Sequence, residues 1–342
     1  MTSLEFTQKL IKEIVPKQAY CDMTDHEKWK EEAYDRLEAL LGLPLPKCDD
    51  CFEIVEDVQE KEFRRLAFMF QTEPGYYQTY TMLVPTGLQQ PVPGVICMQG
   101  HSSGAHISIG KEKFEGDAQT IAGGRDFALQ AVKQGYCAIA VEQRYMGENG
   151  QVATGDPSCI KKNAALPSIL IGRNAIGERV WDIHRLIDII ERYLTEYIDS
   201  SMIVCMGNSG GGTTTFYAAC YDERIQIAIP SCAVCTYEDS IGAMFHCSCN
   251  YVPNIRTYFN MGDLGCLIAP RLVFVVSGER DPIFPLDGAR ASVEIMRKAY
   301  KKLDAKDNCY HIIGDGGHQF FPEDVWPLVK KYIEEKEMKD EI

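Results

Sequence analysis

From residue 95 onward, apolar runs of four to seven residues alternate with longer segments that have the spacing of amphipathic helices. A strand that is apolar along its whole length is buried on both faces, which is typical of a parallel sheet covered by helices on both sides. The alternation therefore predicts an α/β fold on a mostly parallel sheet, to which we assign eight strands. The runs that form the parallel part are 95–98, 137–141, 202–206, 225–229, 271–277 and 309–313, and the main helical segments are 126–134, 175–197, 288–303 and 322–335.

The first part of the chain has a different pattern. Residues 52–84 show strand patterns broken by turn residues, which predicts an antiparallel start of the sheet. Residues 1–50 are mostly helical by pattern, and His26–Leu43 carries apolar residues at helical spacing. We therefore expect an N-terminal helical extension over 1–50 and an α/β domain over 51–342.

The charge and the cysteine content limit the partners and the compartment. Lys and Arg number 35 against 49 Asp and Glu, a net charge of −14, which argues against binding nucleic acid or an anionic membrane through a basic face. The N-terminus lacks the basic and apolar regions of a signal peptide, and no apolar run approaches the length of a membrane span. The 14 cysteines are then expected to be reduced thiols in the cytoplasm.

A Gly-x-Ser-x-Gly motif at 207–211 follows the apolar run 202–206, and small residues continue after it. This order predicts a tight strand-to-helix turn that pushes the Ser209 hydroxyl out at the carboxyl end of the sheet. The glycines let the backbone pack closely, and the first amides of the helix point at whatever the hydroxyl attacks. Ser209 is therefore the candidate nucleophile.

A nucleophilic serine needs a base and an orienting acid, and each is expected directly after another strand. Asp281 follows the run 271–277 in a proline-bounded loop, and His318 follows the last strand on a glycine-rich loop. The order Ser209, Asp281, His318 is that of nucleophile, acid and base in α/β-hydrolases. Asp315 and Glu279 are the rival acids; Asp315 is too near His318 in sequence, and Glu279 precedes the apex of its loop.

An oxyanion hole needs two backbone amides. The first belongs to Gly210, the residue after the nucleophile. The second is expected from the loop after the first parallel strand, where the amide of His101 or Ser102 is the candidate.

These segments together resemble the α/β-hydrolase superfamily, and within it the dienelactone-hydrolase-like and acetyl xylan esterase-like branch. The resemblance spans roughly residues 90–325 and implies an α/β-hydrolase fold, which we assign to 51–342. It also implies a carboxylic-ester hydrolase, since those relatives are mostly ester hydrolases, many acting on acylated carbohydrates. True dienelactone hydrolases use a cysteine where this chain has Ser209. The residues that carry the resemblance are Gly100-His101, 142–148, 180–182, 207–211, 269–271, 278–282 and Gly317-His318.

Residues 232–266 are expected to form a short cap over the serine, with aromatic side chains as pocket walls. This stretch holds a Cys-x-x-Cys pair that begins at Cys232 and a His-Cys-x-Cys run at 246–249, a pattern that zinc sites share. Cys232 is expected to end a strand, however, and the Cys-x-Cys spacing is poor for chelating one ion. We therefore expect cap packing with no metal and no other cofactor.

Four further residues are candidates for substrate binding. Glu142 and Arg144 follow a strand at the same edge as Ser209, where they would bind substrate or form a structural ion pair, and we favour the ion pair. His246 and Tyr251 belong to the expected cap.

The sequence thus predicts a serine esterase that cleaves a small-molecule ester with a short acyl group, such as acetyl, through an acyl-enzyme on Ser209. One alternative is a prolyl-oligopeptidase-like peptidase, although nothing in the chain could build the β-propeller of those enzymes. The other is a non-catalytic hydrolase-fold binding module, which would lack a triad member. The N-terminal helices are expected to pack on the domain or on a second copy of the chain, as a homo-oligomer.

Overall fold

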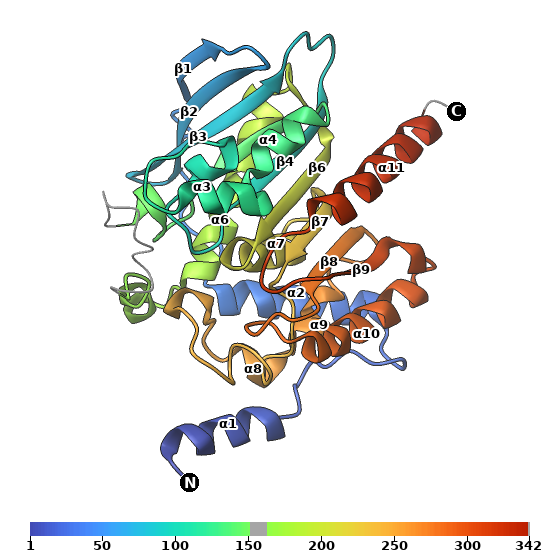
Figure 1. Cartoon of the computed structure of the whole chain (residues 1–342). Coiled ribbons are helices and arrows are strands. Elements are labelled where there is room, and N and C mark those ends of the chain that lie inside the picture. Colours follow the sequence, from blue (N-terminus) through green and yellow to red (C-terminus); the bar gives the residue numbers. More distant parts are fainter. Residues whose placement is uncertain (151–162, 341–342) are drawn as a thin grey trace.

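A computed structural model describes residues 1–150 and 163–340, and its strands form one nine-stranded sheet in the order β1-β2-β3-β5-β4-β6-β7-β8-β9 (Figure 1). The sequence-based count of eight strands was wrong by one. The antiparallel edge begins with β1 (Glu53–Gln59), which lies within the stretch 52–84 where strand patterns were recognised, so only the total was too low.

The first strands form an antiparallel edge of the sheet. β1 pairs with β2 (Phe63–Glu73), β2 with β3 (Tyr76–Pro85), and β3 with β5 (Cys137–Val141), each pair antiparallel. The rings of Phe68 and Phe70 stack on Tyr80 with centroids 5.4 and 4.9 Å away, which packs this edge against the core.

The remaining strands are parallel to β5, so their carboxyl ends meet at one edge, which we call the rim. The loops that carry the candidate site leave the rim at Gln99, Ser209, Glu279 and Asp315. These strands are β4 (Val92–Met98), β6 (Ile198–Asn208), β7 (Ile225–Ser231), β8 (Leu272–Gly278) and β9 (Cys309–Gly314).

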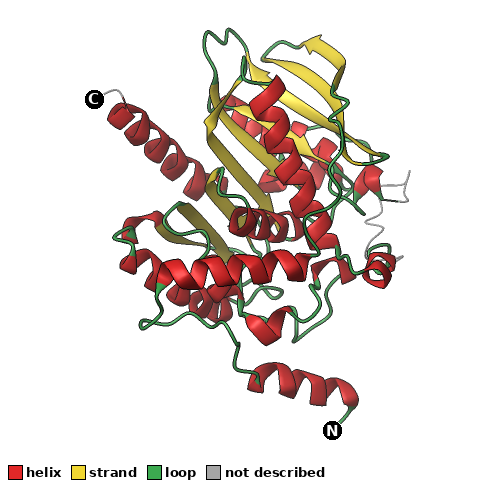
Figure 2. Cartoon of the chain, turned by 180° about the vertical axis from the view of Figure 1, so that it is seen from behind, coloured by secondary structure: helices red, strands yellow, loops and turns green. Residues whose placement is uncertain are grey.

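Helices cover both faces of the sheet and enclose two hydrophobic cores (Figure 2). One core contains Trp29, Trp181 and Tyr217, and the other contains Phe127 and Trp326. The N-terminal helix α2 therefore shares a core with the sheet. The helices of the first face are α2 (His26–Leu41), α6 (Ala175–Tyr193), α7 (Gly210–Tyr221) and α10 (Leu286–Lys302), and those of the second are α4 (Phe127–Lys133) and α11 (Pro322–Asp340).

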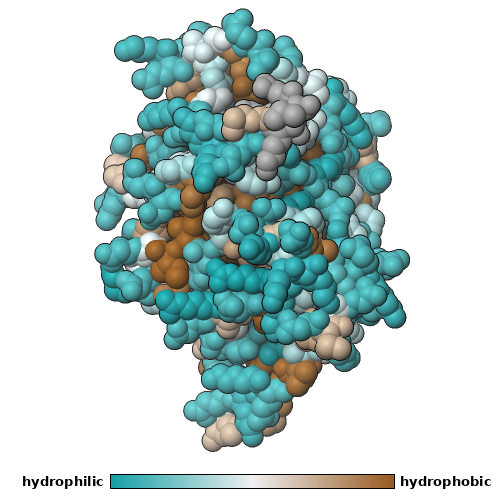
Figure 3. All heavy atoms as spheres, turned by 90° about the vertical axis from the view of Figure 1, so that its right-hand side faces the viewer, coloured by the Kyte–Doolittle hydropathy of each residue, from teal (hydrophilic) through white to brown (hydrophobic). Residues whose placement is uncertain are grey.

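Helix α1 (Ser3–Glu13) projects from the body, as the lobe at the foot of the molecule in Figure 3 shows. Thr2 caps it, and none of its residues is buried. Leu4 and Phe6 are 65% and 51% exposed, and Gln8 Nε2 donates to Ala243 O at 2.8 Å. The rest of the face in Figure 3 is mostly hydrophilic.

Short helices complete the described residues, and none of the helices described is both long and apolar enough to cross a membrane. The short helices are η1 (Ala105–Ile109), α3 (Asp117–Thr120), η2 (Ile121–Arg125), η3 (Gly147–Asn149), η4 (Pro167–Ile171), η5 (Ser248–Asn250), α8 (Ile255–Tyr258), α9 (Met261–Gly265) and η6 (Lys306–Asn308).

Candidate active site

Ser209 lies at the turn between β6 and α7, with φ 57° and ψ −124°. A non-glycine residue rarely adopts this backbone conformation, and such strain is concentrated at functional sites. The neighbouring glycines make the turn possible: a Cβ on Gly207 would lie 2.5 Å from the carbonyl carbon of Gly211, and one on Gly211 would lie 2.3 Å from Met98 O. Close packing of β4, β6 and α7 thus requires the glycines that flank the serine.

Asp281 and His318 are joined by a hydrogen bond of 2.8 Å between Oδ2 and Nδ1. The other oxygen of Asp281 accepts from the amides of Ile283 and Phe284 at 2.8 and 3.1 Å. Burial alone would raise the pKa of Asp281, but the hydrogen bond and charge of His318, with the two amides, lower it. Asp281 is therefore held as a buried carboxylate on one nitrogen of the imidazole.

The other nitrogen, His318 Nε2, is buried and has no hydrogen-bond partner in the described part of the chain. The ring stacks on Phe284 with centroids 6.0 Å apart, which limits its rotation. Ser209 is half-buried on the same rim. No hydrogen bond joins Ser209 Oγ to Nε2 here; in unliganded enzymes such contacts often tighten only when substrate binds.

The two rival acids lie at the surface. The Glu279 and Asp315 side chains are 58% and 87% exposed, and both contact the guanidinium of Arg280, at 3.3 and 2.6 Å. The loop that carries His318 crosses the end of β8 so closely that a Cβ on Gly278 would lie 1.9 Å from Gly317 O. This crossing brings His318 to Asp281 and leaves the rival carboxylates in solvent.

The loop after β4 packs directly on the serine. A Cβ on Gly100 would lie 2.8 Å from Ser209 Cβ, and one on Gly210 would lie 3.2 Å from His101 Cε1. The segment from Gly100 to Ser102 therefore borders the serine and the first turn of α7, where the sequence predicted the oxyanion amides.

Residues 1–311 match the Abhydrolase family. The chain belongs to that family. The match begins at the first residue, so it includes the N-terminal helices, and it ends before His318. A curated relative is YtaP of Bacillus subtilis (strain 168), assigned provisionally as a hydrolase, which is 23% identical over 239 residues, 69% of this chain and 76% of the relative.

Solved structures share the fold of this abhydrolase. A Bacteroides fragilis NCTC 9343 protein, provisionally assigned as an acetyl xylan esterase, superposes with a TM-score of 0.74 at 18% identity, over 92% of this chain and 82% of that one. A glucuronoyl esterase from Solibacter usitatus superposes with a TM-score of 0.70 at 14% identity, over 94% and 98%. The prediction of an α/β-hydrolase fold is confirmed.

Sequence reasoning missed Arg125, at the end of η2. The side-chain amide of Asn208 has one orientation in which both its oxygen and its nitrogen have hydrogen-bond partners. In that orientation the oxygen accepts from Arg125 Nη1 at 3.0 Å and from the Ser209 amide at 3.2 Å. Nη2 would lie 3.1 Å from a Cβ on Gly100. None of the described carboxylates forms an ion pair with this guanidinium, and burial lowers its pKa to about 10. A lone arginine in a glycine-rich loop gives no signal in the sequence.

Cys232 is a second residue that the abhydrolase places beside the Asp281–His318 pair. Its Sγ donates to Gln319 O at 3.2 Å, and the reactive atoms of Cys232, Asp281 and His318 all lie within 4.8 Å of one another. Burial, with the nearby Asp281 charge, raises the pKa of the thiol to about 12. The thiol is therefore a neutral neighbour of the carboxylate.

Two of the predicted substrate-binding residues have other partners. Arg144 is buried, with a two-point contact to Asp182 at 2.8 and 2.7 Å and a contact to Glu73 at 2.5 Å. Glu142 accepts from the Ala105 amide at 2.9 Å, and burial raises its pKa to about 8. Because Arg144 joins β5 to α6 and Glu142 holds the loop after β4, we leave both out of the proposed substrate site.

The two cap residues differ in position. His246 Nε2 lies 3.1 Å from Ser240 Oγ, and its ring meets Phe284, which also stacks on His318. Burial, with the nearby histidines, lowers the pKa of His246 to about 4, so it borders the site as a neutral ring. Tyr251 is 41% exposed and lines a cavity of about 150 Å³ shared with Ile11 of α1.

Proposed function

We propose that this abhydrolase is a serine esterase that cleaves a carboxylic ester through an acyl-enzyme on Ser209. The observation that carries the proposal is the Asp281–His318 pair. The carboxylate occupies Nδ1, and Nε2 is buried without a partner among the residues described, on the rim that carries the strained Ser209. This is the arrangement of a general base that takes a serine proton.

In the proposed reaction, Ser209 Oγ bonds to the ester carbonyl carbon while its proton passes to His318 Nε2. Asp281 stabilises the imidazolium that forms. Collapse of the tetrahedral intermediate breaks the bond to the alcohol oxygen, which takes the proton from His318. Water then attacks the acyl-serine, with His318 as base, and releases the acid and the free serine.

The negative oxygen of each intermediate faces the amide of Gly210 and an amide of His101 or Ser102. We assign Arg125 a supporting role there. Its guanidinium is anchored by Asn208 and lies against Gly100, so a positive charge with no carboxylate partner among the described residues borders the place where negative charge develops.

A short acyl group fits the surroundings of the serine. The His101 ring and the methyl group of Met146 come within 3.2 and 2.9 Å of a Cβ position on Gly210, which crowds the space beside the elbow. The structural neighbour provisionally assigned as an acetyl xylan esterase supports a sugar as the alcohol part of the ester. We therefore propose a small acetylated carbohydrate as the substrate class.

A panel of esters graded by acyl length, on aryl and sugar alcohols, tests the proposal. We expect acetyl esters to be cleaved fastest, and Ser209→Ala to lose at least about 10⁴-fold in kcat/KM. The matched control is Ser201→Ala, an exposed serine of β6, the strand that leads to Ser209; this variant should retain wild-type rates. An aminoacyl amide in the same panel tests for peptidase activity.

Labelling with a fluorophosphonate probe separates an enzyme from a binding module. The proposed nucleophile should be modified in the wild type and in Ser201→Ala, and unmodified in Ser209→Ala. Ester cleavage that survives in Ser209→Ala would refute the serine mechanism.

A further inference from the structure

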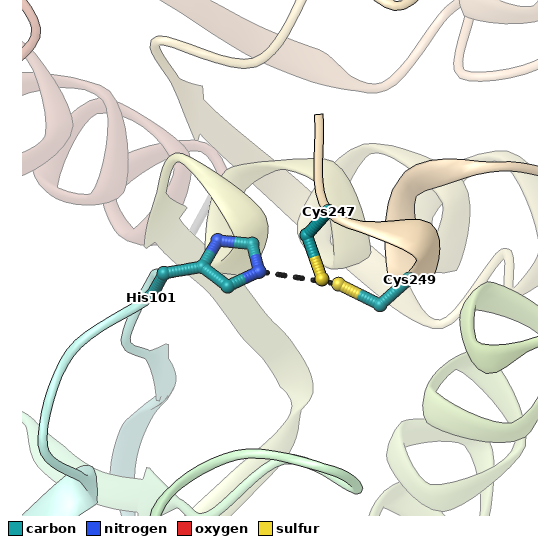
Figure 4. Close-up of side chains that lie close together, drawn as sticks. All are labelled: His101, Cys247 and Cys249. Carbon is teal, nitrogen blue, oxygen red and sulfur yellow. Dashed lines mark hydrogen bonds between the residues drawn. The ribbon is translucent and has the colours of Figure 1, made fainter. Parts of the chain in front are cut away.

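His101, Cys247 and Cys249 come together across 148 positions of sequence (Figure 4). His101 belongs to the loop after β4, and the two cysteines flank the start of η5 in the cap. The distance from His101 Nε2 to Cys249 Sγ is 3.2 Å, and the three donor atoms lie within 4.8 Å of one another. Both sulfur atoms face the same imidazole nitrogen in the figure.

These distances fit a single metal ion. With metal–sulfur bonds of about 2.3 Å and metal–nitrogen bonds of about 2.0–2.1 Å, tetrahedral angles separate nitrogen from sulfur by about 3.5 Å and the two sulfurs by about 3.8 Å. One imidazole and two thiolates are a ligand set that Zn²⁺ favours. Small side-chain shifts would therefore complete three corners of a tetrahedron.

The turn at η5 explains how a Cys-x-Cys pair can serve one ion. Cys247 is the residue before η5 and has extended backbone angles, φ −58° and ψ 141°, while Cys249 lies within the turn. The Asn250 amide donates to Cys247 O at 3.0 Å and closes the turn. The change of backbone conformation between the two cysteines brings both sulfurs to His101, which the spacing in sequence did not reveal.

The surroundings favour a metal over an exposed redox pair. Cys247 and Cys249 are 5% and 0% exposed and pack with Met146, Ala165 and Ala175 in a small apolar cluster. The other residues of the sequence pattern have different neighbours. Cys232 borders Asp281, Cys235 Sγ donates to Pro285 O at 3.5 Å, and His246 contacts Ser240.

We propose that His101, Cys247 and Cys249 bind one Zn²⁺ ion, with a water molecule in the fourth position. This replaces the sequence-based expectation of no metal. The ion would join the cap to the loop that borders Ser209. Because the His101 ring lies against Gly210, it would also hold that loop in place beside the serine. The role assigned to the ion is positioning; it takes no part in the bond changes at the ester.

Metal binding by the full-length protein tests this without any use of esterase activity. Protein stripped with a chelator under reducing conditions is titrated with Zn²⁺ against a chromophoric chelator, and with Co²⁺ in the spectrophotometer. We expect one ion per chain, tetrahedral cobalt bands, and thiolate-to-cobalt charge-transfer absorption. The cobalt spectrum of the wild type needs no variant, so the test survives a substitution that fails to fold.

Variants identify the ligands. Cys247→Ser and Cys249→Ser should each weaken Zn²⁺ binding by more than about 100-fold and diminish the charge-transfer absorption. Cys235→Ser, a buried cysteine of the same cap outside the cluster, is the matched control and should bind as the wild type does. Zinc should also raise the melting temperature of the wild type and of Cys235→Ser. It should leave the melting temperatures of Cys247→Ser and Cys249→Ser unchanged.

Two results would overturn the proposal: a wild-type protein that binds no ion above the level of both cysteine variants, or a cobalt spectrum without thiolate charge transfer. In either case the three residues would be a thiol–imidazole contact and no more. Failure of the zinc titration would leave the serine mechanism untouched, since that mechanism is tested by Ser209→Ala.

Discussion

The loop after β4 contains a second set of serine, histidine and aspartate, and it contrasts with the set at the rim. Ser103, His106 and Asp117 are all buried. His106 Nε2 contacts Asp117 Oδ2 at 2.7 Å and Ser103 Oγ at 3.3 Å, and Ser103 also donates to Asp117. Acid and serine thus share one imidazole nitrogen.

At the rim, in contrast, Asp281 occupies Nδ1 and leaves Nε2 of His318 available. A histidine that acts as the base bonds to the acid through one ring nitrogen and receives the serine proton on the other. Of the two sets, only the one at the rim has this arrangement. Ser103, His106 and Asp117, which we call the closed set, instead fasten α3 to the loop that borders Ser209. In our proposal, the same three residue types thus support chemistry in one place and loop rigidity in the other, according to which nitrogen of the imidazole each partner occupies.

Substitution of each histidine in turn should separate these two roles most strongly. His318→Gln should lower kcat/KM by at least about 10⁴-fold with little change in stability, because the base is lost from a half-buried position. His106→Gln should keep most of the activity and lose about 1.5–3 kcal/mol of stability, since it breaks hydrogen bonds to a buried carboxylate. Ester kinetics and urea unfolding measure the two effects; equal activity losses would contradict the comparison.

The two candidate acids, Asp281 and Asp315, should differ in the same way in their effect on kcat. Asp281→Asn should lower kcat by about 10³–10⁴-fold, because the amide holds the wrong imidazole tautomer. Asp315→Asn, the rival acid paired with Arg280 at the surface, should leave kcat unchanged. Steady-state kinetics of the two variants decide between the acids, and a large loss in Asp315→Asn would reverse the assignment.

The pH dependence of stability should identify the closed set. Burial would raise the pKa of Asp117, but hydrogen bonds from Ser103, the Lys113 amide and His106 lower it from 3.8 to about 2. The stabilisation is therefore present above about pH 4 and is lost as the pH falls towards 2, by at most about 2 kcal/mol. Urea unfolding of wild type and Asp117→Asn across this range measures it; parallel curves would contradict the prediction.

Arg125 should give the smallest effect. Arg125→Gln should lower kcat by about tenfold with little change in KM, because the charge acts on the intermediate more than on the bound ester. Arg125→Lys should recover part of the rate. The control Arg297→Gln removes an exposed arginine of α10 and should have no effect. A change in KM alone would show that Arg125 acts in substrate binding and not in stabilising the oxyanion.

Much of the fold could be read from local patterns. Buried strands are apolar along their length and helices have their own period, so the order of elements from β4 to α11 follows from the sequence. The antiparallel strands β1 and β2 lie within the stretch 52–84, where strand patterns were also recognised. The candidate triad was equally local, since each member directly follows a strand and parallel strands end at one rim.

Contacts between distant segments were decided by the tertiary structure. The crossing of the Gly317 loop over Gly278 selects Asp281 over Asp315 and Glu279, and the path of η2 brings Arg125 to Asn208. The turn at η5 brings two cysteines to His101. Loops carry no periodic pattern, and their paths depend on the packing of the elements they join, so the sequence by itself determined the scaffold and the order Ser209, Asp281, His318, while only the tertiary structure decided which side chains meet around them.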